Sequence, residues 1–240
     1  MTTSRLDSAT VQRLSQVSTA TLTSQLLQRG FRNTFIAGLQ PLRPDLRLFG
    51  YAFTLRYVPA REDLDMQVHY DNSTNVQRLT VEAIGPQDVL VIDARGDSRA
   101  VSFGHIIATR ILQRGAAGLV TDGGLRDTPR FRALELPTYI KAPHATTSSV
   151  LHHPADMNVP IGCGGVMVVP GDVVVGDAEG VVIIPLGVAE EVANDAYEQD
   201  LIEEYALSKV QAGAAIRGVY PPDEQTRAEF LAWRSQRADL

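Results

Sequence analysis

A strand–helix–strand unit in the middle of the chain most narrows the folds that this sequence can form. The runs DVLVID (88–93) and AGLVT (117–121) are short and apolar, which is typical of buried strands. Between them, residues 103–114 carry apolar side chains at helical spacing and end before Gly115, which predicts a helix. Two parallel strands need a long crossover connection, which is usually a helix. The unit therefore predicts an α/β domain with at least one parallel pair of strands.

The flanking segments indicate that this unit belongs to a compact α/β sandwich. Helical spacing of apolar residues predicts helices over 8–29, 73–84 and 187–212. Alternating or β-branched runs predict strands over 51–59 and 136–142.

A valine-rich stretch over 164–185 predicts a second, mostly antiparallel layer with a small barrel-like sheet. Its strands are expected to be joined by a turn at Pro170, Gly171 and Asp172. We expect a single domain over residues 1–212. The C-terminal extension, 213–240, is expected to pack on the body or on a neighbouring subunit.

Composition and charge argue against several classes of protein. The 240 residues carry a net charge of −6 and no run of five basic residues, so nucleic-acid binding is not expected. No uninterrupted apolar run of about 20 residues is present, which argues against a membrane span. The N-terminus lacks the apolar segment of a signal peptide, and a single cysteine excludes an internal disulfide. We therefore expect a cytoplasmic protein.

Charged residues and glycines crowd the carboxyl ends of the two strands of the central unit. Asp93 and Asp97 follow the first strand, and the run DGGLRD (122–127) follows the second. In open α/β sheets, ligands bind beyond the carboxyl ends of the strands. The start of the crossover helix, at Gly104, opens on the same side.

Three kinds of group are therefore predicted to meet at one pocket. The free backbone N–H groups of the helix start at Gly104 can bind a carboxylate or a phosphate. Arg126 can bind an oxyanion. Asp127, with Asp122, Asp93 or Asp97, can hold a hard cation. The same residues also fit a plain strand-end turn with a surface Arg126–Asp127 pair, because such turns often contain Asp and Gly.

Other reactive side chains have a functional and a structural interpretation. Glycine-flanked Cys163 can be a nucleophile, but a buried structural thiol is favoured. His144, His152 and His153 can form a transition-metal site, and surface histidines in a polar loop are favoured. The only lysines are Lys141 and Lys209, so a Schiff-base mechanism has two candidates.

Three stretches occur in the order that characterises a known family. They are LSQVSTATLTSQL (14–26), FGHIIATRILQRGAAGLVTDGGLRD (103–127) and PGDVVVGDAEGVVIIP (170–185). Together they resemble the RraA-like family, which contains class II 4-hydroxy-4-methyl-2-oxoglutarate / 4-carboxy-4-hydroxy-2-oxoadipate aldolases and the regulator of ribonuclease E activity. The resemblance spans roughly residues 14–210. It implies an α/β sandwich of the swivelling β/β/α type and a homotrimer or hexamer.

The resemblance also implies roles for the residues of the predicted pocket. The backbone amides of Gly104, His105, Ile106 and Ile107 would bind the carboxylate of a pyruvyl group. Arg126 would contact the keto or enolate oxygen and act as the catalytic residue. Asp127 would be the one direct protein ligand of Mg²⁺ or Mn²⁺.

Two positions differ from the family pattern or cannot be aligned with it. Position 105 is often acidic in the aldolases, and here it is His105, which can bind a metal-bound water or can mark weaker or altered metal binding. The family uses an acidic residue from a neighbouring subunit's C-terminal helix. Glu203 and Glu204 are candidates for that residue, and a solvated helix face is the favoured alternative.

The leading functional hypothesis is a divalent-metal-dependent lyase acting on a small 2-oxo acid. It would release pyruvate by retro-aldol cleavage, decarboxylate oxaloacetate, or do both. The loops around residues 60–72 and the C-terminal tail would set its substrate. The alternative is a non-catalytic regulator that binds a protein such as an RNase. A methyltransferase is disfavoured because no glycine-rich loop follows a first strand.

Overall fold

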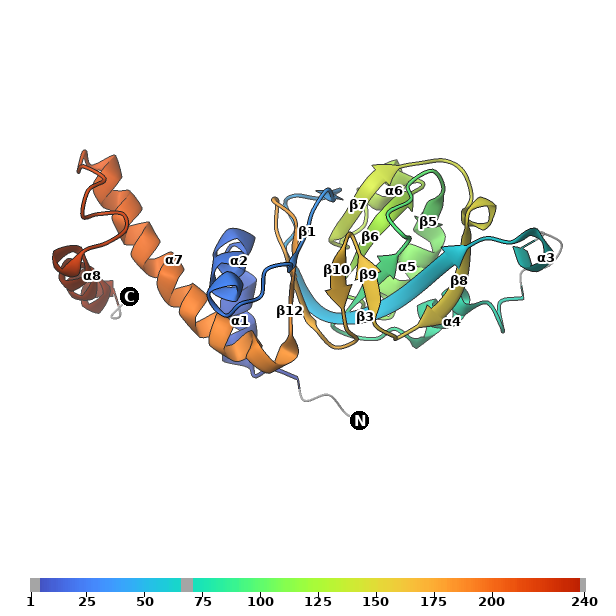
Figure 1. The fold of residues 1–240 in the computed structure, drawn as a ribbon, viewed down its shortest axis with the longest axis horizontal. Helices are drawn as coiled ribbons and strands as arrows, with labels where there is room; N and C mark the ends of the chain where they lie inside the picture. The colour runs from blue at the N-terminus through green and yellow to red at the C-terminus, as the bar shows by residue number, and fades with distance from the viewer. Residues whose placement is uncertain (1–4, 66–70, 238–240) are drawn as a thin grey trace.

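The fold is built around one curled, mixed sheet (Figure 1). The computed structural model describes residues 5–65 and 71–237, and within these ranges ten strands form the sheet. Its order is β1–β12–β11–β3–β4–β6–β7–β2, with β5 paired to β6 and β8 paired to β3. The strands are β1 (Phe35–Ile36), β2 (Gln40–Pro41), β3 (Leu48–Pro59), β4 (Asp88–Asp93), β5 (Val101–Phe103), β6 (Gly118–Leu125), β7 (Thr138–Pro143), β8 (His152–Met157), β11 (Val173–Gly176) and β12 (Val181–Ile184).

The centre of the sheet is parallel, as the strand–helix–strand unit predicts. β3, β4, β6 and β7 run in one direction, and Val89 of β4 lies opposite Gly118 of β6. The interior of β4 and the whole of β6 are buried. Burial on both faces is why β4 is almost continuously apolar, whereas β6 also contains Thr121 and Asp122. The predicted strand over 88–93 has the same bounds as β4.

Helices cover the sheet at two places and leave its concave side to a small hairpin. α4 (Val76–Ala83), α5 (His105–Gln113) and α6 (Thr128–Phe131) pack over the parallel strands, and α1 (Ser8–Gln16), α2 (Thr19–Gln28) and α7 (Ala189–Gln211) pack over β11 and β12. The hairpin of β9 (Ile161–Cys163) and β10 (Val166–Val168) closes a third cluster of apolar side chains. No helix in the described ranges is long and apolar enough to cross a membrane.

The predicted α/β class with a barrel-like mixed sheet is confirmed. The valine-rich strands are antiparallel as expected, but β11 and β12 continue the main sheet instead of forming a layer of their own. The reason is the length of β3, which pairs with β4 along one edge and with β11 and β8 along the other. The turn at Pro170 consequently connects two different sheets, because β10 pairs only with β9 within the described residues.

The C-terminal segment lies against the far end of a projecting helix (Figure 1). α7 packs on the body through its first turns, where Val192, Ala193 and Ala196 are buried. α8 (Glu224–Arg237) folds back on the distal half of α7, where the Tyr205 and Trp233 ring centroids are 5.4 Å apart. Contact of this segment with a neighbouring subunit stays a prediction.

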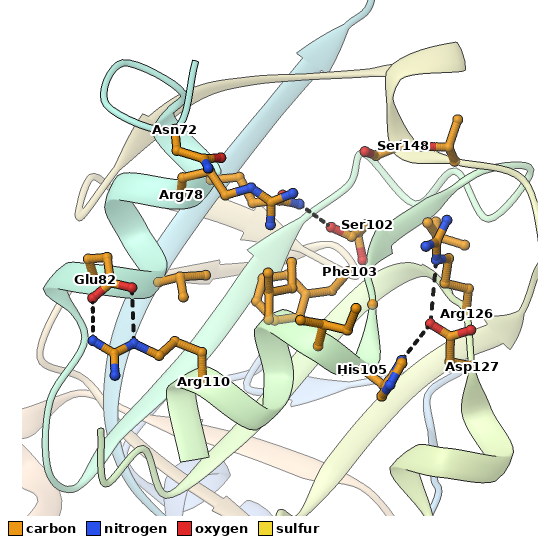
Figure 2. Close-up of a pocket in the computed structure, with 17 residues that line it drawn as sticks. Asn72, Arg78, Glu82, Ser102, Phe103, His105, Arg110, Arg126, Asp127 and Ser148 are labelled. Carbon is orange, nitrogen blue, oxygen red and sulfur yellow. Dashed lines mark hydrogen bonds and ion pairs between the residues drawn. The ribbon is translucent and has the colours of Figure 1, made fainter. Parts of the chain in front are cut away.

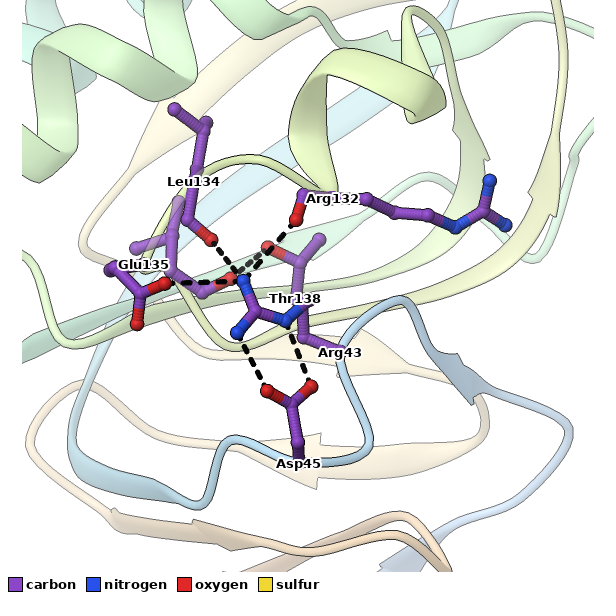
Figure 3. A network of polar contacts seen from close by, with 7 residues as sticks. Arg43, Asp45, Arg132, Leu134, Glu135 and Thr138 are labelled. Atoms are coloured by element: carbon purple, nitrogen blue, oxygen red, sulfur yellow. Dashed lines mark hydrogen bonds and ion pairs between the residues drawn. The ribbon is translucent and has the colours of Figure 1, made fainter.

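An arginine network ties the edge strand β2 to the segment before β7 (Figure 3). The guanidinium of Arg43 donates to both carboxylate oxygens of Asp45, at 2.8 and 2.6 Å. It also donates to the carbonyl oxygens of Arg132 and Leu134, at 3.2 and 3.3 Å. This network fixes the end of the α6 segment, which follows the residues of the predicted pocket.

Gly50 of β3 provides a test of how tightly the parallel centre is packed. A Cβ at this position would lie 2.4 Å from the carbonyl oxygen of Gln87 and 2.8 Å from Cγ2 of Val89. Gly50→Ala should therefore lower the free energy of unfolding by about 1–3 kcal/mol, the usual cost of overpacking. Urea denaturation measures this change. Gly162→Ala is the matched control, because a Cβ there meets nothing within 4 Å, and an equal loss in both variants would contradict the packing argument.

Candidate active site

A pocket of about 480 Å³ lies at the carboxyl ends of the parallel strands (Figure 2). It is enclosed by α4, the start of α5, β5 and the end of β6. The residues that line it are Asn72, Gln77, Arg78, Val81, Glu82, Val101, Ser102, Phe103, Gly104, His105, Ile106, Ile107, Arg110, Arg126, Asp127, Thr147 and Ser148.

The N-terminus of α5 opens into this pocket without a side-chain cap. Gly104 is the N-cap residue in extended backbone, and it has no side chain with which to accept from the helix. The first helical hydrogen bond runs from the amide of Ala108 to the carbonyl oxygen of Gly104, at 3.1 Å. The amides of the first turn thus have no acceptor within the helix, and the helix dipole adds partial positive charge at this end.

Arg126 and Asp127 follow β6 and lie directly in front of this helix end. A Cβ on Gly104 would be 3.4 Å from Nε of Arg126 and 3.7 Å from Oδ2 of Asp127. Asp127 has a φ of +61°, in the left-handed region that Asp tolerates better than most residues. It occupies the N-cap position of α6 but makes no capping hydrogen bond, because its carboxylate is turned toward the pocket. The structure therefore brings Gly104, Arg126 and Asp127 together, as the sequence predicts.

His105 connects this carboxylate to a second arginine. Its Nδ1 lies 3.0 Å from Oδ2 of Asp127, and its Nε2 lies 3.1 Å from a terminal nitrogen of Arg130. A guanidinium can only donate, so Nε2 accepts and the ring proton sits on Nδ1, which donates to Asp127. Hydrogen bonds from His105, with the nearby charge of Arg126, hold the pKa of Asp127 below its usual range.

Asp122 does not face the pocket, because β6 continues through it to Leu125. Its side chain is 2% exposed and accepts three backbone hydrogen bonds, from Ala94 at 2.7 Å, Gly96 at 2.8 Å and Gly164 at 3.0 Å. Burial raises the pKa of this carboxyl. The expectation that Asp122 could help to hold a cation is wrong, since its two oxygens are committed to the backbone.

Asp93 and Asp97 are not brought to Asp127 either. Asp93 accepts from the amides of Arg95 and Gly162, at 2.8 and 3.3 Å. Asp97 pairs with Arg99, whose hydrogen bonds lower its pKa strongly. Among the described residues, no group of three or more His, Cys, Asp or Glu side chains could hold a metal ion. Any metal at this pocket would therefore rest on Asp127 with few further protein ligands.

The histidines, cysteine and lysines considered from the sequence lie outside the pocket. His152 is not on a surface loop as expected: it is 1% exposed on β8, where its ring lies 5.5 Å from that of Tyr57 and burial lowers its pKa. Cys163 is a buried thiol with a raised pKa, as favoured. Lys141 donates to the carbonyl oxygen of Gly96 at 2.6 Å, and Lys209 pairs with Glu229 on α8.

The structure adds pocket residues that sequence reasoning did not find. Arg78 and Glu82 come from α4 and Arg110 from α5, and only the packing of these two helices brings them together. Of the predicted substrate loop, Asn72 lines the pocket and residues 66–70 lie outside the described residues. Glu203, which accepts from Gln199 at 2.8 Å, and Glu204 belong to α7 and do not line this pocket. Their reach into a neighbouring subunit stays a prediction.

Stability measurements can distinguish the environments of Asp122 and Asp127. Asp122→Asn replaces one acceptor oxygen with a donor and leaves at least one buried backbone N–H without a partner. We expect a loss of about 1–3 kcal/mol in the free energy of unfolding. Asp127→Asn changes a partly exposed carboxylate in a backbone conformation that Asn also tolerates. The free energy of unfolding of this variant should therefore stay close to that of the wild-type protein. Urea denaturation of both variants tests this, and equal stabilities would contradict the structural role of Asp122.

Comparison with known proteins assigns the chain to a family. A sequence model described as RraA-like, Aldolase/RraA, matches residues 19–183 and thus more than half of the chain. The protein belongs to the RraA-like family. The Gly104, Arg126 and Asp127 constellation lies within the matched region.

Relatives of this RraA-like protein carry two kinds of name. The 4-hydroxy-4-methyl-2-oxoglutarate aldolase of Thermus thermophilus is 30% identical over 155 residues, covering 64% of this chain and 92% of the relative. A Halalkalibacterium halodurans protein, provisionally named for the same activity, is 37% identical over 146 residues, covering 61% of this chain and 67% of the relative. The structure of Streptomyces coelicolor RraAS2, described as an unusual member of the RNase ES inhibitor RraA protein family, has a TM-score of 0.76 and 31% identity, covering 85% of this chain and 98% of that one.

Proposed function

We propose that the protein is a divalent-metal-dependent lyase that cleaves a C–C bond of a small 2-oxo acid and leaves the enolate of pyruvate. The observation that carries the proposal is the contact of Arg126 and Asp127 with the uncapped start of α5 across Gly104. The names of the aldolase relatives support the same reaction class. We also propose, from the resemblance, that the protein acts in the cytoplasm as a homo-oligomer.

The start of α5 would bind the carboxylate of the pyruvyl group. Its first-turn amides have no acceptor in the helix, and the dipole favours an anion there. Gly104 leaves the approach to these amides open because it has no side chain. A carboxylate bound at this point lies beside Arg126, so the adjacent keto oxygen can reach the guanidinium.

Arg126 would stabilise the charge that develops on the keto oxygen. In retro-aldol cleavage, the 4-hydroxyl group loses its proton to water as the C–C bond breaks, and the other fragment leaves as a carbonyl compound. The electron pair of the broken bond moves into the enolate, which then takes a proton from water to give pyruvate. Loss of CO₂ from oxaloacetate sends its electron pair to the same enolate, so one site can serve both reactions. Removal of a single donor to such an oxyanion typically costs about 3–4 kcal/mol of transition-state stabilisation.

The donor set fits a magnesium or manganese ion, which Asp127 would hold. Mg²⁺ is usually bound by one or two carboxylates and keeps several waters, so a single carboxylate at the pocket wall is enough. Such an ion, when bound, would supply positive charge that polarises the 2-keto group. His105 donates to Oδ2 of Asp127 at 3.0 Å, and Nε of Arg126 forms an ion pair with the same oxygen at 3.4 Å, so these two contacts fix the direction of the carboxylate.

Pyruvate release from oxaloacetate and from a 4-hydroxy-2-oxo acid tests the proposal. We expect turnover that needs added Mg²⁺ or Mn²⁺ and stops with a chelator. Arg126→Ala should lower kcat by about 10²–10³-fold because it removes the oxyanion donor. Direct titration of Mn²⁺ should show weaker binding to Asp127→Asn. Turnover without a metal, or trapping of substrate on Lys141 or Lys209 by borohydride, would contradict this mechanism.

Gly104→Ala tests the binding of the substrate carboxylate without disturbing the fold. The backbone of Gly104 is extended, a conformation that alanine adopts readily. The added methyl group would lie in ordinary contact distance of Arg126, 3.4 Å from Nε, and would occupy the space in front of the first-turn amides. We expect an unchanged thermal midpoint and a raised KM for oxaloacetate. An unchanged KM would show that the carboxylate binds elsewhere.

A regulator that binds an RNase is the second candidate. It is favoured by the similarity to Streptomyces coelicolor RraAS2, which extends over 85% of this chain. Only the lyase function needs Arg126 to stabilise an enolate. Absence of pyruvate release from every 2-oxo acid, together with binding of a purified RNase that survives the Arg126→Ala change, would favour the regulator over the lyase.

A further inference from the structure

The imidazole of His105 has a partner at each of its two ring nitrogens. Nδ1 lies 3.0 Å from Oδ2 of Asp127, and Figure 2 shows this pair at the wall of the pocket. Nε2 lies 3.1 Å from a terminal nitrogen of Arg130. Because the guanidinium can only donate, the lone pair of Nε2 faces Arg130 and the ring proton lies on Nδ1. Neither nitrogen is therefore open to a further partner.

The separation of His105 and Asp127 is close to that of two ligands on one ion. Nitrogen and carboxylate oxygen ligands lie about 2.0–2.2 Å from a tetrahedral Zn²⁺, which places two of them about 3.3–3.5 Å apart. The observed distance between Nδ1 and Oδ2 is 3.0 Å. An imidazole nitrogen is a ligand that Zn²⁺ and Ni²⁺ accept readily, whereas Mg²⁺ and Mn²⁺ prefer oxygen. The Nδ1 proton thus occupies the place that such an ion would take between the two side chains.

Arg130 is held beside His105 by the short helix that begins at Asp127. The amides of Arg130 and Phe131 donate to the carbonyl oxygen of Asp127, at 2.8 and 3.1 Å. Phe131 is 1% exposed and anchors this turn in the apolar cluster under α5. Among the described residues, the contact with His105 is the one hydrogen bond that the Arg130 guanidinium makes. The backbone of α6 therefore directs Arg130 to the imidazole.

We propose that Arg130 keeps His105 from becoming a metal ligand and thereby sets which ions the Asp127 site accepts. With Nε2 engaged by Arg130, the site offers a carboxylate oxygen alone, which suits Mg²⁺ or Mn²⁺. Without this contact the ring proton can move to Nε2, and the lone pair of Nδ1 can join Asp127 as a second ligand for Zn²⁺. The inference rests on the proposed function in one respect, the divalent ion at Asp127.

Arg130→Met tests this role, because it removes the donor and keeps most of the length of the side chain. Loss of a positive charge strengthens the binding of every divalent cation, so the measured quantity is the ratio of Zn²⁺ to Mn²⁺ affinity. We expect calorimetry to show a rise in this ratio of about 10-fold, the lower end of the change that outer-shell partners of a ligand cause. Arg130→Lys, which retains a donor, should stay close to wild type. An unchanged ratio in Arg130→Met would overturn the proposal.

Two further variants assign the effect to His105. Arg132→Met is the matched control, since Arg132 is also exposed and contributes its carbonyl, not its side chain, to the Arg43 network. It should leave the ratio of affinities unchanged. His105→Ala combined with Arg130→Met should abolish the gain in Zn²⁺ binding, because the second ligand is then lost. A gain that survives this double change, or an equal gain in Arg132→Met, would contradict the role of Arg130.

Nitrogen NMR of the metal-free protein separates this inference from the lyase proposal. The His105 ring should carry its proton on Nδ1 in the wild-type protein and in Arg130→Lys, and more often on Nε2 in Arg130→Met. A proton on Nε2 in the wild-type protein would overturn the inference. If Asp127→Asn leaves Mn²⁺ affinity unchanged, the metal-dependent lyase proposal fails. A gain of Zn²⁺ binding in Arg130→Met that depends on His105 would still support the role of Arg130.

Discussion

The geometry of the pocket depends on the backbone hydrogen bonds that the buried carboxylate of Asp122 accepts. It lies inside β6 and accepts from backbone amides of the segment after β4 and of the turn between β9 and β10. Two chain segments are thereby fixed to a buried side chain of β6 at the carboxyl end of the sheet. β6 can then run on to Leu125 and leave Arg126 and Asp127 at its end, in front of α5. From the sequence, Asp122 is a candidate metal ligand. In the structure it instead holds the backbone that positions Arg126 and Asp127.

The same region shows how far the sequence could predict the fold. The apolar run over 88–93 is sufficient to place β4, because a strand buried on both faces leaves a continuous apolar signal. The end of β6 could not be placed, because Asp122, Gly123 and Gly124 have the composition of a turn. Their glycines are there for close packing: a Cβ at Gly123 would lie 2.5 Å from Cβ of Ala94, and one at Gly124 would lie 2.8 Å from the carbonyl oxygen of Ala100.

The candidate site was predictable where its residues belong to one local unit. Gly104, Arg126 and Asp127 flank the same crossover helix and its following strand, so their meeting depends only on the handedness and direction of that unit. Arg78 and Glu82 could not be placed, because their positions depend on the packing of α4 against α5, which no local pattern records. His152 is expected on the surface but is buried, because β8 pairs with β3. The residues around it in the sequence give no sign of this pairing.

The histidine at position 105 changes the charge around Asp127 without leaving its carboxylate unsupported. An acidic side chain in this place would add negative charge beside Asp127 and would face Arg130 as an acceptor. His105 also accepts from Arg130 through Nε2, but it presents a donor to Asp127 through Nδ1. Oδ2 of Asp127 therefore accepts from His105 and forms an ion pair with Arg126. Asp127 is thus left as the carboxylate that faces the start of α5. A cation held there would be attracted less strongly than by a pair of carboxylates. The positive charge of Arg126 would then contribute a larger share of the stabilisation of an enolate.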